Sequence, residues 1–239
     1  MNNMVAEAAR TSGARTQTTI AIERLRADIV TGTLRPNEKL RVQALAERYG
    51  LAASSLREAL SRLVADALVV AEDQRGFRVS PVSRADLLDL TEARVGIEGL
   101  ALARAVESGD VGWESEIIGA FHRLSRCQEG GEPTSPEALH WSACHAEFHR
   151  ALIAGCGSEW LLYFSRLMFE KSDRYRMLVT YSRPPGARNP LGEHKALMHA
   201  AIERSKDEAC RLLGAHFRET TRLLLEADRS ISGLKASRW

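Results

Sequence analysis

Four histidines have the residue type and the spacing of a metal site. His145 and His149 lie four residues apart, so on a helix both imidazole rings would point the same way. His194 and His216 lie in two later segments, and the four rings converge if these segments pack side by side. Neutral imidazole is a good ligand for Zn, Ni, Cu and Fe. From spacing alone such a pair is more often a packing or surface pair than a metal site, so both interpretations stay open.

The other histidines and the cysteines show no comparable pattern. His122, His140 and His199 have no partner set and are interpreted as surface or packing residues. The cysteines are irregularly spaced and form no CxxC motif, which is typical of reduced thiols in a cytosolic protein. We find no GxSxG, HExxH or phosphate-binding loop, so no catalytic centre is indicated. The four cysteines are Cys127, Cys144, Cys156 and Cys210.

Helices must position the four histidines, and the chain after Pro81 predicts six of them. Ser83 is the expected N-cap of the first, with Asp86 in its first turn to suit the helix dipole. The later helices are predicted over residues 111–126, 134–154, 160–181, 190–204 and 205–227, the last of them opened by a capping box at 205–208. The apolar stripe of the first helix is predicted to comprise Leu87, Leu90, Ile97, Leu100 and Ala101.

The first third of the chain predicts short helices followed by a hairpin. Apolar periodicity and turn residues place helices over 20–31, 42–49 and 54–67, and strands over 68–71 and 76–79. Two short helices joined by a tight turn, with a hairpin after them, make a winged helix-turn-helix. Such a unit places its second helix in the major groove of DNA. On spacing alone, a small helical domain with another partner fits equally well.

Composition agrees with a mainly α protein of two domains. The chain has 239 residues, 44% hydrophobic and only 6% aromatic, which favours helices over sheets. We expect a flexible arm over 1–17, a DNA-binding domain over 18–80 and an all-helical domain over 81–239. Residues 1–80 carry 12 Lys and Arg against 9 Asp and Glu, so the basic excess lies in the first domain. Neither a signal peptide nor an apolar run of membrane length is present, which predicts a cytoplasmic protein without a membrane partner.

The first domain resembles the DNA-binding domain of GntR-family transcription regulators. The resemblance rests on residues 34–40 (LRPNEKL), 45–51 (LAERYGL), 56–63 (LREALSRL) and 75–79 (RGFRV). The helical remainder resembles the effector domain (FCD type) of the FadR subgroup, so the resemblance covers nearly the whole chain. It implies a homodimer on a palindromic operator of double-stranded DNA.

The recognition helix departs from the family pattern. Family members usually carry Ser/Thr-Arg-Thr-Pro-Val before Arg-Glu-Ala-Leu, whereas residues 52–56 here read AASSL. Ala53 therefore stands where the family places a DNA-contacting arginine, and we expect a non-standard operator or weaker readout. The residues expected to contact DNA are Arg41, Gln43, Ser54, Ser55, Arg57, Arg62, Arg75 and Gly76.

The resemblance also assigns a metal and an effector site. His149, His194 and His216 match the family's metal-binding positions, and His145 stands where a carboxylate is usual. An all-imidazole site suits Zn or Ni better than Mn and leaves the charge of the metal uncompensated. A small organic acid could then complete the site. The expected effector-binding residues are Arg94, Glu98, Arg174 and Arg176, although a salt bridge between Arg94 and Glu98 explains that pair equally well.

These features predict a transcriptional repressor, not an enzyme, whose operator affinity is controlled by a small carboxylated metabolite bound near the metal. The alternative is a helical metalloenzyme that uses the four histidines. Catalytic zinc usually has three protein ligands and an open position, and the winged helix has no role in that alternative. A metal clamp with a purely structural role is a third interpretation.

Overall fold

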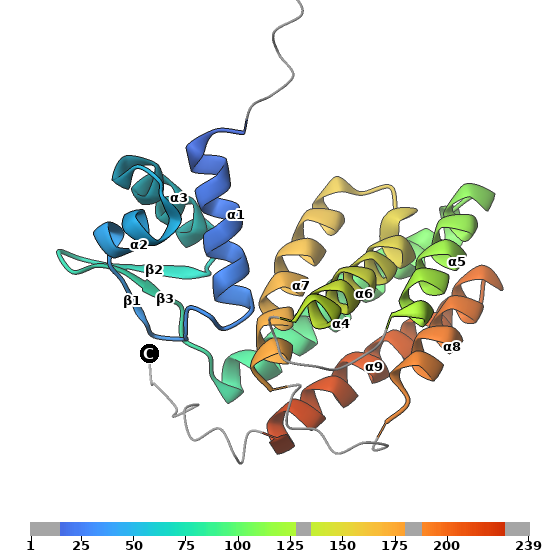
Figure 1. Cartoon of the computed structure of the whole chain (residues 1–239). Helices are drawn as coiled ribbons and strands as arrows, with labels where there is room; N and C mark the ends of the chain where they lie inside the picture. The colour runs from blue at the N-terminus through green and yellow to red at the C-terminus, as the bar shows by residue number, and fades with distance from the viewer. Residues whose placement is uncertain (1–14, 128–134, 180–187, 228–239) are drawn as a thin grey trace, which may run out of the picture. The chain divides into compact units, whose positions relative to one another are not determined.

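The computed structural model describes residues 15–127, 135–179 and 188–227 (Figure 1). Most of the expected N-terminal arm lies outside these residues. Contacts between Cα atoms divide the chain into two compact units, and the main boundary falls between Pro81 and Val82. Each unit has a hydrophobic core of its own. None of the described helices is long and apolar enough to cross a lipid bilayer.

The helices of the first unit form a helix-turn-helix preceded by one further helix. The helices are α1 (Gln17–Val30), α2 (Val42–Tyr49) and α3 (Ala53–Ala65). Gly50 ends α2 with a φ of 65°, a left-handed conformation that glycine adopts without strain, so the chain turns directly into α3. Leu25, Leu56 and Leu60 are completely buried in the core between the helices. Leu56 and Leu60 lie four residues apart on α3, the spacing expected for one face of a helix.

The wing is a three-stranded antiparallel sheet, where the sequence predicted a two-stranded hairpin. Strands β2 (Val69–Glu72) and β3 (Gly76–Val79) pair as expected, with Val69 opposite Val79. The additional strand β1 (Lys39–Leu40) pairs with the other edge of β3, giving the order β1-β3-β2. Two residues are too few to show the alternation that identifies a strand, so β1 had no signal in the sequence.

The second unit contains helices α4 to α9, and the mainly α fold class is confirmed (Figure 1). Its main core lies between α4, α5, α6, α8 and α9, and a smaller one lies between α4, α7 and α9. Ser83 caps α4 as predicted, because its hydroxyl accepts a hydrogen bond from the Asp86 N–H at 3.1 Å. The six helices are α4 (Arg84–Ser108), α5 (Val111–Arg126), α6 (Pro136–Ala154), α7 (Glu159–Val179), α8 (Pro190–Ile202) and α9 (Lys206–Ala227).

The buried face of α4 differs from the predicted stripe. Leu100 was expected to face the core, but 51% of it is exposed. The face instead continues through Thr91, Arg94 and Glu98, which are all buried. A prediction based on apolar residues alone is therefore wrong at the positions where the buried face of the helix carries polar residues. Ala101 lies one turn beyond Glu98 and returns the stripe to the core.

Candidate metal centre and nucleic-acid interface

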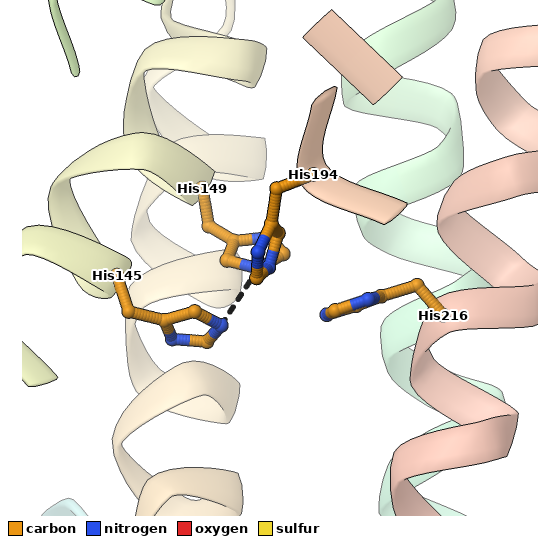
Figure 2. Close-up of side chains that lie close together, drawn as sticks. All are labelled: His145, His149, His194 and His216. Carbon is orange, nitrogen blue, oxygen red and sulfur yellow. Dashed lines mark hydrogen bonds between the residues drawn. The ribbon is translucent and has the colours of Figure 1, made fainter. Parts of the chain in front are cut away.

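Four histidines from three helices converge inside the second unit (Figure 2). Helix α6 supplies His145 and His149, α8 supplies His194 and α9 supplies His216. One ligand nitrogen from each ring lies within 4.8 Å of the others, and all four side chains are buried. The ring centres of His145 and His149 lie 4.5 Å apart, and those of His194 and His216 lie 4.6 Å apart. The structure thus brings together the four residues that the sequence predicted.

Burial keeps these four imidazoles neutral. Loss of solvent is the main cause that lowers the pKa of His145, His149 and His194 well below its usual value. It also lowers the pKa of His216, against the opposing effect of Glu193. Neutral imidazole is the form that binds metal ions, so the site presents the histidines in the right protonation state.

The surroundings of His194 and His216 fit a role of these two residues as metal ligands. His216 Nδ1 lies 2.8 Å from Glu193 Oε2 and donates its hydrogen to that carboxylate, so Nε2 keeps its lone pair. A carboxylate behind a histidine in this way is common at metal sites. His194 Nε2 is buried and makes no hydrogen bond with any described residue. An unpaired buried nitrogen costs free energy, so the chemistry of this position fits a metal ion bound to Nε2.

His145 is held differently from the other three histidines. Arg176 Nη1 lies 3.0 Å from His145 Nδ1, and since a guanidinium only donates, this nitrogen accepts. Neutral His145 then carries its hydrogen on Nε2, which lies 3.1 Å from His149 Nε2 and donates to it. His145 must lose its contact with Arg176, or change its tautomer, before it can bind a metal ion. The residue at the position where the family usually has a carboxylate is thus the least prepared to be a ligand.

Arginines approach the histidines, each with an acidic partner. Arg94 Nε donates to Glu98 Oε1 at 2.7 Å, so the predicted salt bridge is present, and its guanidinium lies 3.9 Å from the centre of the Phe217 ring. Arg176 pairs with Asp173 one turn away. Burial is the main cause that raises the pKa of Glu98, and Arg94 opposes it.

Two further arginines are Arg174, which the sequence proposed for the effector site, and Arg188, which it did not. Arg174 lies close enough to Asp86, near the start of α4, for the two side chains to interact electrostatically. Arg188 was not predicted, yet its Nη2 donates to the His216 backbone carbonyl oxygen at 3.0 Å and it pairs with Glu193. It precedes α8 by two residues, and no sequence pattern connects it with a histidine 28 positions later.

A second group of potential ligands lies where α5 ends beside α6. Cys127 Sγ lies 2.9 Å from Cys144 Sγ, which lies 3.9 Å from His140 Nε2. Burial and the contact with Cys144 raise the pKa of the Cys127 thiol to about 11. His140 is exposed as expected, but it does have partners. The four-residue spacing of His140 and Cys144 was the available signal, whereas the approach of Cys127 depends on packing.

The expected DNA-contacting residues lie around the helix-turn-helix and in the wing. Neither α2 nor α3 has a side-chain cap, because Arg41 and Ala52 occupy their N-cap positions. The first N–H groups of α3 are therefore open to an anion such as a phosphate. Arg57 is exposed on α3, whereas the exposed Arg62 pairs with Glu58 at 2.6 Å. The remaining expected residues are Gln43 on α2, Ser54 and Ser55 in the first turn of α3, and Arg75 and Gly76 at the turn of the wing.

Comparison with known proteins decides the family. Residues 17–79 match the family described as bacterial regulatory proteins, gntR family, and residues 89–219 match the FCD domain. The chain belongs to the GntR family. Members of this family are regulators that bind DNA, and the helix-turn-helix is the part of this GntR-family chain that would contact it.

Curated relatives extend over most of this GntR-family chain. The HTH-type transcriptional regulator BphR of Paraburkholderia xenovorans is 38% identical over 81% of this chain and 79% of its own. The HTH-type transcriptional repressor GlaR of Escherichia coli is 34% identical over 80% of this chain and 88% of its own. Among solved structures, E. coli McbR/YncC has the same fold, with a TM-score of 0.74 at 20% identity over 89% of this chain and 99% of its own. The chain is thus a transcriptional regulator and not an enzyme.

Proposed function

We propose that this regulator is a repressor of the FadR subgroup whose operator affinity responds to a small carboxylate bound beside a divalent transition metal. The observation that carries the proposal is the convergence of four buried, neutral histidines in a chain that also carries a helix-turn-helix. The proposal includes a cytoplasmic homodimer on a palindromic operator, because two symmetric DNA-binding units match two half-sites.

The donor set fits Zn or Ni. His149, His194 and His216 would hold the ion through Nε2, and His145 is the fourth candidate once its contact with Arg176 is released. Nitrogen donors of this kind suit these metals better than oxygen-seeking ions. When bound, the ion would supply a positive centre for a carboxylate. The His194 nitrogen without a hydrogen bond is the strongest support for an ion at this place.

The arginine contacts support an anionic effector. Arg176 donates to His145 Nδ1 at 3.0 Å and to Ser142 Oγ at 3.0 Å. Its fork can bind a carboxylate in two-point fashion, and taking up an effector there would also free His145. Arg94 and Glu98 remain candidates for the effector site, and Arg188 joins them because it contacts His216. Arg174 is the weakest candidate, since it lies near the start of α4.

The metal half of the proposal is tested by elemental analysis of protein purified with added Zn or Ni. We expect about one ion at the histidine cluster, and a loss of that ion in His194→Ala and in His216→Ala. His199→Ala is the matched control, because His199 is exposed on the same helix as His194. Unchanged metal content in both cluster variants would remove the metal site from the proposal.

The effector half is tested by thermal shifts against a panel of organic acids, with and without metal. A sensor is stabilised by particular acids only when metal is present, and the same acids change the affinity for operator DNA in a gel-shift assay. A structural clamp is stabilised by metal alone. Equal gel shifts with and without every acid of the panel would favour the clamp.

A further inference from the structure

A second set of possible metal ligands comprises Cys127, His140 and Cys144. Cys127 follows the last residue of α5, and His140 and Cys144 lie one turn apart on α6. One ligand atom from each residue lies within 4.8 Å of the others. Cys144 directly precedes His145, but consecutive side chains on a helix point about 100° apart. Cys144 therefore points away from the direction of His145, and the group shares no ligand atom with the four histidines.

The two remaining cysteines show what thiols do elsewhere in the described protein. Cys156 Sγ contacts the Ser158 carbonyl oxygen at 3.8 Å, and Cys210 Sγ contacts the Gly99 carbonyl oxygen at 3.5 Å. Each of these thiols donates to a backbone carbonyl oxygen, and Cys127 makes the same kind of contact with the Arg123 carbonyl oxygen at 3.2 Å. Cys127 and Cys144 differ from them, since each has a second sulfur at 2.9 Å and an imidazole close by.

The chemistry and the spacing of this group suit a thiophilic cation. Two thiolates and an imidazole are a common donor set for zinc, and the two thiolate charges would balance a divalent ion. In a tetrahedral zinc site the two sulfurs lie about 3.8 Å apart, so they would have to separate by about 1 Å. Cys127 lies beyond the end of its helix and His140 is exposed, so both can adjust. The exposure of His140 leaves the fourth position to water.

We propose that Cys127, His140 and Cys144 form a second metal site, which takes a zinc-class divalent cation independently of the four histidines. The site would join the end of α5 to α6 through the cation. Because its donors include sulfur, it can be observed separately from a site made only of imidazoles.

The test is a titration of reduced, metal-free, full-length protein with Cd(II) in the absence of oxygen. Cadmium bound to thiolate gives an ultraviolet charge-transfer band that cadmium bound only to imidazole lacks. We expect this band in the wild type and in the His194→Ala/His216→Ala double variant, and we expect added Zn(II) to abolish it. The result is therefore separate from the fate of the histidine cluster.

Matched variants assign the band to these residues. Cys127→Ser should abolish two-thiolate binding, and His140→Ala should weaken cadmium binding at least about tenfold. Cys210→Ser and His122→Ala are the controls, because they replace a half-buried cysteine and an exposed histidine outside the group; both should keep the band. Circular dichroism checks that each variant is folded. The proposal is overturned if the reduced wild type shows no band, even if Cys127 and Cys144 form a disulfide on oxidation. It is also overturned if the band is unchanged in Cys127→Ser.

Discussion

Arg94 and Glu98 show how the second unit accommodates charge in its interior. The two side chains are 9% and 2% exposed and form an ion pair on one face of α4. Arg94 also donates to Ser172 Oγ at 2.8 Å, so its guanidinium is held from two helices. Such a pair adds little stability compared with apolar residues, but removing one partner leaves the other charge buried and alone.

Removing Glu98 should therefore be costly. We expect Glu98→Ala to lower the free energy of unfolding of this unit by about 3–5 kcal/mol, measured by urea denaturation. The matched control is Glu92→Ala on the same helix, since Glu92 pairs with Arg218 but is 61% exposed; that loss should stay below about 1 kcal/mol. If both variants lost the same free energy of unfolding, the burial of the Arg94–Glu98 pair would not determine the cost of removing Glu98.

Arg57 and Arg62 should contribute unequally to DNA binding. Arg62 is already paired with Glu58, whereas Arg57 forms no ion pair with an acidic side chain among the described residues. We expect Arg57→Ala to weaken binding by about 1–3 kcal/mol, the usual contribution of a good contact to a base, and Arg62→Ala to weaken it less. Fluorescence anisotropy with a duplex selected from a random pool measures both. Unchanged affinity in Arg57→Ala would contradict its assignment to the interface.

At the residue scale, the sequence predicted side chains on one helix better than contacts between helices. The His145 and His149 pair follows from helical geometry alone, whereas His194 and His216 join it only if their helices pack beside it, an expectation that the family resemblance supported. Contacts such as Arg188 with His216, or Cys127 with Cys144, depend on how helices pack and leave no local pattern. The exposed Leu100 was misjudged for a related reason, because buried polar residues interrupt the apolar stripe of α4.

The helices of the helix-turn-helix differ from others at their N-termini, and even α1 of the same unit has a cap, since Thr16 Oγ1 accepts a hydrogen bond from the Thr19 N–H at 3.1 Å. Helices α4, α5, α6 and α8 begin with side-chain caps from Ser83, Asp110, Ser135 and Asn189. Helices α2 and α3 have none, although a capping side chain typically stabilises a helix by about 1 kcal/mol. The uncapped end of α3 keeps its N–H groups available for a phosphate of the DNA backbone.

A cap introduced at Ala52 should trade DNA affinity for stability. We expect Ala52→Asp to raise the free energy of unfolding of the first unit by about 0.5–2 kcal/mol. It should also weaken DNA binding, because its carboxylate occupies and repels the phosphate position. Ala52→Asn is the control, which caps the helix without adding charge and should weaken binding less. If Ala52→Asp became more stable and bound DNA normally, the end of α3 would not contact a phosphate.

Helices were the elements best predicted from sequence. Their caps, glycines and prolines mark both ends, as at Ser83 before α4 and Gly50 after α2. Strand β1 could not be predicted, since its two residues are defined by their partner β3 and not by a pattern of their own.

At the scale of the whole molecule, the two separate hydrophobic cores predict that a core substitution in one unit lowers the free energy of unfolding of that unit alone. Leu60 is fully buried in the first unit and Leu152 in the second. We expect Leu60→Ala to cost about 2–5 kcal/mol in the first unit only, and Leu152→Ala a similar amount in the second only. Hydrogen exchange followed by mass spectrometry at increasing urea resolves the two units. Loss of protection in both units from either variant would show that they unfold together.

The neutral imidazoles have a thermodynamic consequence for the whole regulator. Among the described residues, the carboxylate of Glu193 contacts the cluster at His216 and already pairs with Arg188, so an ion there would gain a counter-charge from the effector. Thermodynamic linkage then couples the affinity for the metal to the affinity for the acid. The bound acid raises the metal affinity by the same factor by which the bound metal raises the acid affinity, typically about 5–150-fold. The apparent metal affinity of such a protein is not a constant of the chain but a function of metabolite concentration, which isothermal calorimetry at two acid concentrations would reveal.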